Sequence, residues 1–149
     1  MRKKILFILL FSSMSIIFSQ SSQVMDKIIE SDTVEFRYGL YLILVASNHI
    51  SQDIDPLSVQ DSDIINQLNS MNIKINPQEI NSNLTYFNAA YLVMESLNIK
   101  GGVFYTIFKN PRYALRELKY LTYLQKDIDG NDYISGIELI NLIGEALHE

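Results

Sequence analysis

The stretch that decides the fold lies near the end of the chain, where residues 110–147 read NPRYALRELKYLTYLQKDIDGNDYISGIELINLIGEAL. Asn110 and Pro111 signal a helix start, because Asn caps a helix well and Pro fits its first turn. Apolar residues then recur at helical spacing, namely Leu115, Leu118 and Leu121. A second helix is expected from Ser135, with apolar positions at Ile137, Ile140, Ile143 and Leu147. The stretch predicts two helices joined by a polar loop.

Helical periodicity continues upstream of this stretch. Thr33 is expected to cap a helix whose all-apolar run at 38–46 makes it central and buried. After a polar connector at 51–61, a further helix is predicted from the stripe Ile64, Ile65, Leu68 and Met71. Another is predicted from Phe87, Ala90, Tyr91, Met94 and Leu97. It should end at Gly101, a residue suited to the left-handed C-terminal position.

The segment 103–108 is the one candidate for a strand, and we interpret it as an apolar connector packed on the core, with Phe104, Tyr105 and Phe108 buried. The fold class predicted is all-α, built from helix–loop–helix units. A shift of 50 residues superposes the unit at 62–100 on the unit at 111–148, with Leu84 falling on Ile134.

The N-terminus has the order of a secretory signal peptide, which we place at 1–19. A basic start is followed by an apolar stretch at 5–18 and then by small or polar residues. The apolar stretch is shorter than the roughly 20 residues that a membrane span needs. An uncleaved N-terminal anchor is the alternative. The mature chain is thus expected to be exported to the periplasm or secreted, with no membrane span of its own.

Composition excludes several classes of protein. With 149 residues, of which 48% are apolar, the chain can form one domain, at 20–149, but not two ordinary ones. It has no Cys and two His, which excludes disulfide scaffolds, thiolate zinc sites and multi-His metal sites. Without the signal peptide, nine Lys and Arg face 17 Asp and Glu, a net charge of −8 that argues against a nucleic-acid partner. No catalytic motif is present, so we expect no enzyme.

The loop at 127–138, DIDGNDYISGIE, carries the most informative pattern. Oxygen-bearing side chains recur at alternate positions, and a Glu stands at the twelfth. The loop resembles the calcium loop of EF-hand proteins, whose ligand positions are occupied here by Asp127, Asp129, Asn131, Tyr133 (through its carbonyl), Ser135 and Glu138. The resemblance implies one Ca²⁺ site between the two helices, in an EF-hand-like pair.

Two features limit that resemblance. The sixth position is usually Gly because the backbone turns there with positive φ, and here it is Asp132. We therefore expect weak binding, with a dissociation constant of roughly 10⁻⁴–10⁻³ M. The partner loop at 77–88 has Pro77 first and Asn88 last, so it is predicted to be degenerate and metal-free while Leu84 still pairs with Ile134.

Two alternatives need no metal. Ser135 and Glu138 also form the sequence pattern of a capping box, which satisfies backbone donors at a helix start. Tandem helical units with an Asp/Gly-rich loop, then Ser or Thr and Glu, also resemble S-layer homology modules, which attach exported proteins to cell-wall polymers. The first expectation is an exported calcium-binding protein with a structural or regulatory role, whose partners are Ca²⁺ and another envelope protein. The alternative is a metal-independent envelope scaffold or interaction module.

Overall fold

The computed structural model describes residues 23–148, and the predicted signal peptide lies outside them. A short helix at 23–29 precedes α2 (Phe36–Ala46), α3 (Asp61–Ser70), the 3₁₀ helix η1 (Pro77–Asn81), α4 (Tyr86–Ser96), α5 (Val103–Phe108), α6 (Pro111–Tyr120) and α7 (Gly136–Leu147). The described residues contain no strand, only two isolated bridges, so the all-α prediction is confirmed. None of their helices is long and apolar enough to cross a bilayer.

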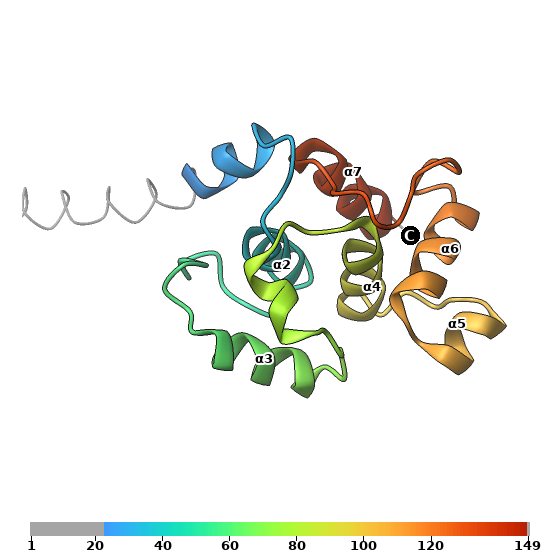
Figure 1. Cartoon of the computed structure of the whole chain (residues 1–149), viewed down its shortest axis with the longest axis horizontal. Coiled ribbons are helices and arrows are strands. Elements are labelled where there is room, and N and C mark those ends of the chain that lie inside the picture. The colour runs from blue at the N-terminus through green and yellow to red at the C-terminus, as the bar shows by residue number, and fades with distance from the viewer. Residues whose placement is uncertain (1–22, 149) are drawn as a thin grey trace, which may run out of the picture.

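Three helices, α2, α4 and α7, form the centre of the molecule (Figure 1). The expectation that residues 38–46 are central is met, since α2 is buried from Tyr38 to Leu44. α6 packs against α4, and α3 packs against η1, while Arg37 of α2 forms an ion pair with Asp61 of α3. α5 lies outermost, at one end.

The three central helices begin in the same way, at positions fifty residues apart. A buried residue and then an extended polar residue precede each helix: Val34 and Glu35 before α2, Leu84 and Thr85 before α4, Ile134 and Ser135 before α7. Val34, Leu84 and Ile134 are 0–1% exposed. The 50-residue shift thus superposes three helix starts, one more than the sequence pattern predicted.

Backbone hydrogen bonds join these three residues in a closed ring. The N–H of Val34 donates to Ile134 O at 3.0 Å, Ile134 N–H donates to Leu84 O at 3.0 Å, and Leu84 N–H donates to Val34 O at 2.7 Å. Each residue therefore donates once and accepts once. We call this cyclic arrangement of three buried residues the Val34–Leu84–Ile134 ring.

The helix ends repeat at the same spacing. Asn48 and Asn98, just beyond α2 and α4, both adopt positive φ, and so do Asn72 and Thr122, beyond α3 and α6. No described glycine does, so the expectation that Gly101 ends α4 in a left-handed conformation is wrong. Asn98 takes that position because Asn tolerates the left-handed region and follows the last helical turn directly.

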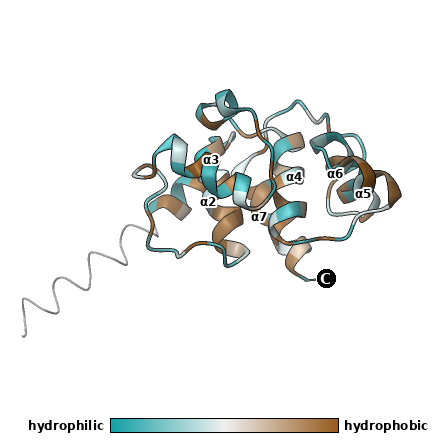
Figure 2. Ribbon diagram, turned by 90° about the horizontal axis from the view of Figure 1, so that it is seen from below, coloured by the Kyte–Doolittle hydropathy of each residue, from teal (hydrophilic) through white to brown (hydrophobic). Residues whose placement is uncertain are grey.

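The segment 103–108 also differs from its prediction, because it is a helix, α5, and not a connector buried on the core. Tyr105 is buried, but Phe104 and Phe108 are each 55% exposed. Figure 2 shows α5 as a hydrophobic ribbon at the edge of the molecule. A six-residue helix that packs on α6 and contacts α4 through Tyr105 can bury only one side, so its remaining apolar residues face outward.

Candidate functional site

The loop at 127–138 uses its backbone to begin a neighbouring helix. Tyr86 N–H, at the start of α4, donates to Asp132 O at 3.0 Å, and Phe87 N–H donates to Gly130 O at 2.9 Å. The first N–H groups of a helix have no partner within it, so these carbonyls complete the N-terminus of α4. Thr85 pairs with Tyr133 in an isolated antiparallel bridge.

The starts of α2 and α7 are completed in the same way, by carbonyl groups from other loops. Ser82 O accepts from Phe36 N–H at the start of α2, at 2.9 Å, and Ser31 O accepts from Gly136 N–H at the start of α7, at 3.0 Å. Each loop thus completes the central helix of another unit. The loop at 127–138 is one of three equivalent structural joints.

Glycine fits this loop because of close packing. A Cβ on Gly130 would lie 2.4 Å from ring carbons of Phe87. Gly136, at the start of α7, lies so close to residues 28–31 that a Cβ would stand 1.6 Å from Ile28 O. Neither glycine has positive φ, so contact, and not backbone conformation, requires them.

The predicted calcium ligands do not all line one hollow. Asp127 and Asp129 line an open groove beside α6, whereas Glu138 lines a different hollow, with Tyr86 and His148. Among residues 23–148 no group of three or more His, Asp or Glu side chains is close enough to hold a metal ion. Asp132 has no positive φ, so the sharp turn that the EF-hand resemblance implies at the sixth position does not occur.

The side chains of Asp129 and Asn131 form a local turn. Asp129 Oδ1 accepts from the backbone N–H of Asn131 at 2.9 Å and from its Nδ2 at 3.1 Å. Lys119 Nζ reaches into the loop from α6 and donates to Ile128 O at 2.5 Å and to Lys126 O at 3.2 Å. An ammonium group therefore holds two carbonyls at the start of the loop.

Ser135 and Glu138 form the capping box of α7. Ser135 Oγ accepts from Glu138 N–H at 3.3 Å, and Glu138 Oε2 accepts from Ser135 N–H at 3.1 Å and from its Oγ at 2.5 Å. Hydrogen bonds from Ser135 and then Tyr86 lower the pKa of Glu138 below its ordinary value. Burial, followed by the bond to Glu138, raises the pKa of Tyr86. The carboxylate is thus engaged with neighbouring donors.

The predicted degenerate loop at 77–88 contains η1. Asn76 caps it by accepting from Gln78 N–H at 3.1 Å, and the buried Asn88 donates through Nδ2 to Glu79 Oε2 at 2.8 Å. Leu84 does lie beside Ile134, but they share one backbone hydrogen bond, and the N–H of Leu84 turns to Val34 instead. The expected pair of loops is therefore part of a set of three.

A groove of about 840 Å³ lies beside α6, and it is lined by cationic, acidic and aromatic side chains. Arg112, Arg116 and Lys119 of α6 line it, facing Asp127 and Asp129 of the loop. Aromatic rings contribute as well, from Phe87 and Tyr113. Cations, carboxylates and rings in an open groove suit a polar, extended ligand better than a bare metal ion, which three cationic side chains repel.

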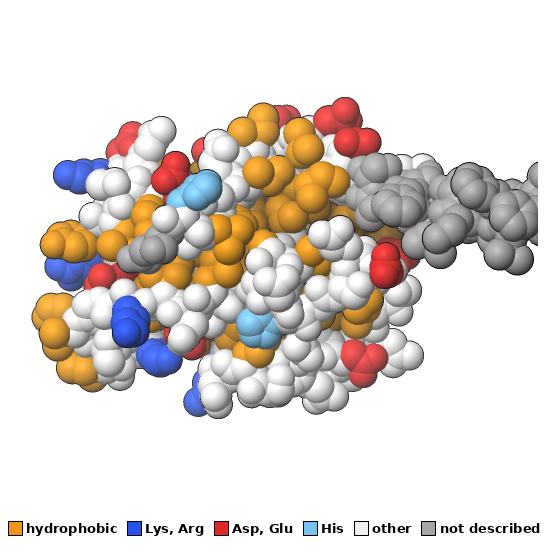
Figure 3. All heavy atoms as spheres, turned by 180° about the vertical axis from the view of Figure 1, so that it is seen from behind, with side chains coloured by type: hydrophobic (Ala, Val, Ile, Leu, Met, Phe, Trp, Pro, Cys, Tyr) orange, Lys and Arg blue, Asp and Glu red, His pale blue; other side chains and the backbone are white. Residues whose placement is uncertain are grey.

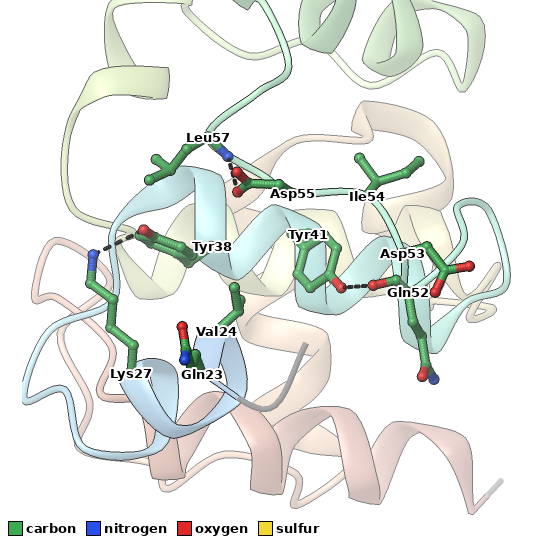
Figure 4. A pocket seen from close by; sticks show the side chains of 10 residues that line it. All are labelled: Gln23, Val24, Lys27, Tyr38, Tyr41, Gln52, Asp53, Ile54, Asp55 and Leu57. Atoms are coloured by element: carbon green, nitrogen blue, oxygen red, sulfur yellow. Dashed lines mark hydrogen bonds between the residues drawn. The ribbon is translucent and has the colours of Figure 1, made fainter. Parts of the chain in front are cut away.

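A second hollow, of about 320 Å³, lies between the 23–29 helix, α2 and the connector (Figure 4). Its rim is held by two hydrogen bonds: Lys27 Nζ donates to Tyr38 Oη at 2.9 Å, and Tyr41 Oη donates to Gln52 O at 2.7 Å. Burial raises the pKa of Tyr41, and Asp53 and Asp55 add to the effect. Because these polar groups already form hydrogen bonds with one another, we do not choose this hollow as the candidate binding site.

Sequence reasoning missed Val34 and the exposed face of α5. The signal for Val34 was present, because it precedes Leu84 by the same 50 residues that separate Leu84 from Ile134. Comparison of the chain with protein-family models, curated proteins and solved structures finds no match.

Proposed function

We propose that this protein is a metal-independent helical interaction module of the cell envelope, of the S-layer homology type. The observation that carries the proposal is the Val34–Leu84–Ile134 ring with its three joints, because backbone hydrogen bonds tie the Asp/Gly-rich loop to the start of α4 and to the two other units. The resemblance to S-layer homology modules implies tandem helical units of this kind, each with such a loop. The folded state then needs no cation to close the loop.

The groove beside α6 is the proposed binding surface. The resemblance implies a cell-wall polymer as ligand, and Arg112 and Arg116 would pair with acidic groups on it while Phe87 offers a ring face to sugars. Export through the predicted signal peptide would bring the module to such a polymer.

A weak calcium site in the loop at 127–138 is the competing proposal, supported by the spacing of its oxygen ligands. The two proposals differ over Asp127, an exposed residue that calcium would need as its first ligand and the metal-independent module does not need. Thermal unfolding of the native chain and of Asp127→Ala, each with millimolar CaCl₂ or with EDTA, separates them. We expect one melting temperature in all four samples. A rise with Ca²⁺ in the native chain that Asp127→Ala abolishes would reject our proposal.

Binding is tested with polygalacturonate as an acidic polysaccharide probe and dextran as its neutral counterpart. We expect the native chain to bind the acidic probe, and Arg112→Gln with Arg116→Gln to weaken binding about tenfold or more. Lys74→Gln is the matched control, since Lys74 is an exposed cation outside the groove. Equal binding by all three proteins would remove the groove from the proposal.

A further inference from the structure

We propose that α5 is a membrane-contact element that binds the surface of an anionic lipid bilayer. The first observation is its exposed apolar face. Val103 is 72% exposed, Ile107 66%, and Phe104 and Phe108 55% each. Four large hydrophobic side chains on one six-residue helix form a contiguous apolar patch of the kind that marks a contact surface.

The helix is firmly held with this face outward. Its one buried side chain, Tyr105, donates to Glu95 Oε1 at 2.5 Å, and Lys109 Nζ contacts Glu95 Oε2 at 3.4 Å. Phe104 and Phe108 stack on Tyr113 of α6, with ring centroids 6.1 Å and 5.3 Å away. The inner side of α5 is thus fixed, and the exposed face is a property of the folded protein.

The positive charge around α5 indicates which kind of partner this apolar face binds. Residues 100–126 hold six Lys or Arg and one Glu, a net charge of +5 in a chain whose net charge is −5. Lys100, Lys109, Arg112 and Arg116 are exposed, and the Arg116 guanidinium lies 5.8 Å from the centroid of the Phe104 ring. Figure 3 shows hydrophobic side chains at one edge with Lys and Arg beside them.

Apolar side chains ringed by cations match a bilayer surface with anionic headgroups, where rings and aliphatic groups enter the acyl boundary and cations pair with phosphates. A wall polymer offers no apolar phase for Val103 and Ile107. The inference therefore goes beyond the proposed binding groove: its ligand is different, and it depends on the apolar side chains of α5, while Arg112 and Arg116 line the groove as well.

The test is co-sedimentation with phosphatidylcholine vesicles, with or without phosphatidylglycerol, using residues 20–149, since the apolar 5–18 stretch could bind lipid itself. This chain keeps the whole hydrophobic core cluster, whose buried members lie at 28–146. We expect binding to the anionic vesicles that weakens with salt. Val103→Ser with Ile107→Ser should weaken it about tenfold or more, and Arg112→Gln about fivefold.

Leu57→Ser is the matched control, because Leu57 is 59% exposed but lies in the connector between α2 and α3. It should leave vesicle binding unchanged. No binding to anionic vesicles, or equal binding by the α5 variant, would overturn the proposal. So would an α5-dependent dimer without lipid binding, because the face would then be a protein contact. Polygalacturonate binding by the α5 variant reports separately on the groove.

Discussion

The backbone N–H of Ile134 donates to the carbonyl of Leu84, fifty residues earlier in the chain, at 3.0 Å. Two facing loops that formed a closed pair would return this bond from Leu84 to Ile134. Leu84 instead donates to Val34, and Val34 donates to Ile134. A third segment is thereby inserted into the pair, so neither helix–loop–helix unit has a complete hydrogen-bonding pattern without residues from the N-terminal part of the domain.

The first prediction concerns cooperativity. Because the three amides close one ring in the buried core, we expect them to open together and not one at a time. Native-state hydrogen exchange should give Val34, Leu84 and Ile134 one opening free energy, equal to that of global unfolding. Thr106 N–H, in the exposed α5, should exchange faster through local opening. A Val34 amide that exchanges far faster than Ile134 would show that the C-terminal units fold independently.

The second prediction compares two glycines of α7. Gly136→Ala places a methyl group against the backbone carbonyl of Ile28, which cannot move without shifting the 23–29 helix, so we expect a loss of about 2 kcal/mol or more in unfolding free energy. Gly144 has no atom within 4 Å of its would-be Cβ, so Gly144→Ala should gain about 0.5–1 kcal/mol from helix propensity. Urea unfolding of both variants measures the difference, and a similar effect of the two changes would contradict the close contact at Gly136.

The sequence predicted α2, α3, α4, α6 and α7, because apolar spacing and caps such as Asn110 and Ser135 are local signals that tertiary packing reinforces. It placed Leu84 beside Ile134 for the same reason, since a 50-residue shift preserves the buried position. The third member was harder to predict. The prediction that Thr33 caps this helix is wrong: α2 begins after Glu35, which makes no side-chain cap, so the turn chemistry that marks the other two helix starts is absent.

The loop at 127–138 shows why a ligand pattern is ambiguous. Asp, Asn, Ser and Glu supply oxygens to a cation, but they also make local turns and helix caps. Asp129 and Glu138 satisfy nearby backbone N–H groups here, a use that the spacing alone does not distinguish from coordination. The exposed face of α5 was missed for a different reason: hydrophobicity predicts burial only when a neighbouring element is available to cover it.

The third prediction concerns pH. The pKa of Glu138 lies below its ordinary 4.5 in the folded state, so its carboxylate stabilises the fold above pH 4.5 and loses that contribution as the pH falls through the folded-state pKa. Glu138→Gln should therefore be less stable than the native chain near neutral pH, by up to about 1 kcal/mol, and equally stable in strong acid. Chemical denaturation across this range, with EDTA throughout, tests it. A difference that persists unchanged at the acid end would contradict the role of the carboxylate.

The last prediction concerns the anchor of α5. Tyr105 is 3% exposed and donates to Glu95, whose side chain is 10% exposed, so Tyr105→Phe leaves a nearly buried carboxylate with Lys109 as its remaining charged partner. We expect a loss of about 1–3 kcal/mol in unfolding free energy at neutral pH. Burial, then the bond to Glu95, raises the pKa of Tyr105 above its ordinary 10.0, so the native chain should lose stability as the pH rises past 10.

The Tyr105→Phe variant lacks that ionisable group and should lose less over the same rise in pH. Tyr120→Phe is the control, because Tyr120 is 82% exposed and its loss should change neither quantity. Urea unfolding at neutral and alkaline pH measures both. If Tyr105→Phe is as stable as the native chain at neutral pH, the bond to Glu95 does not hold α5, and the outward orientation of its apolar face must depend on the stacking of Phe104 and Phe108 on Tyr113.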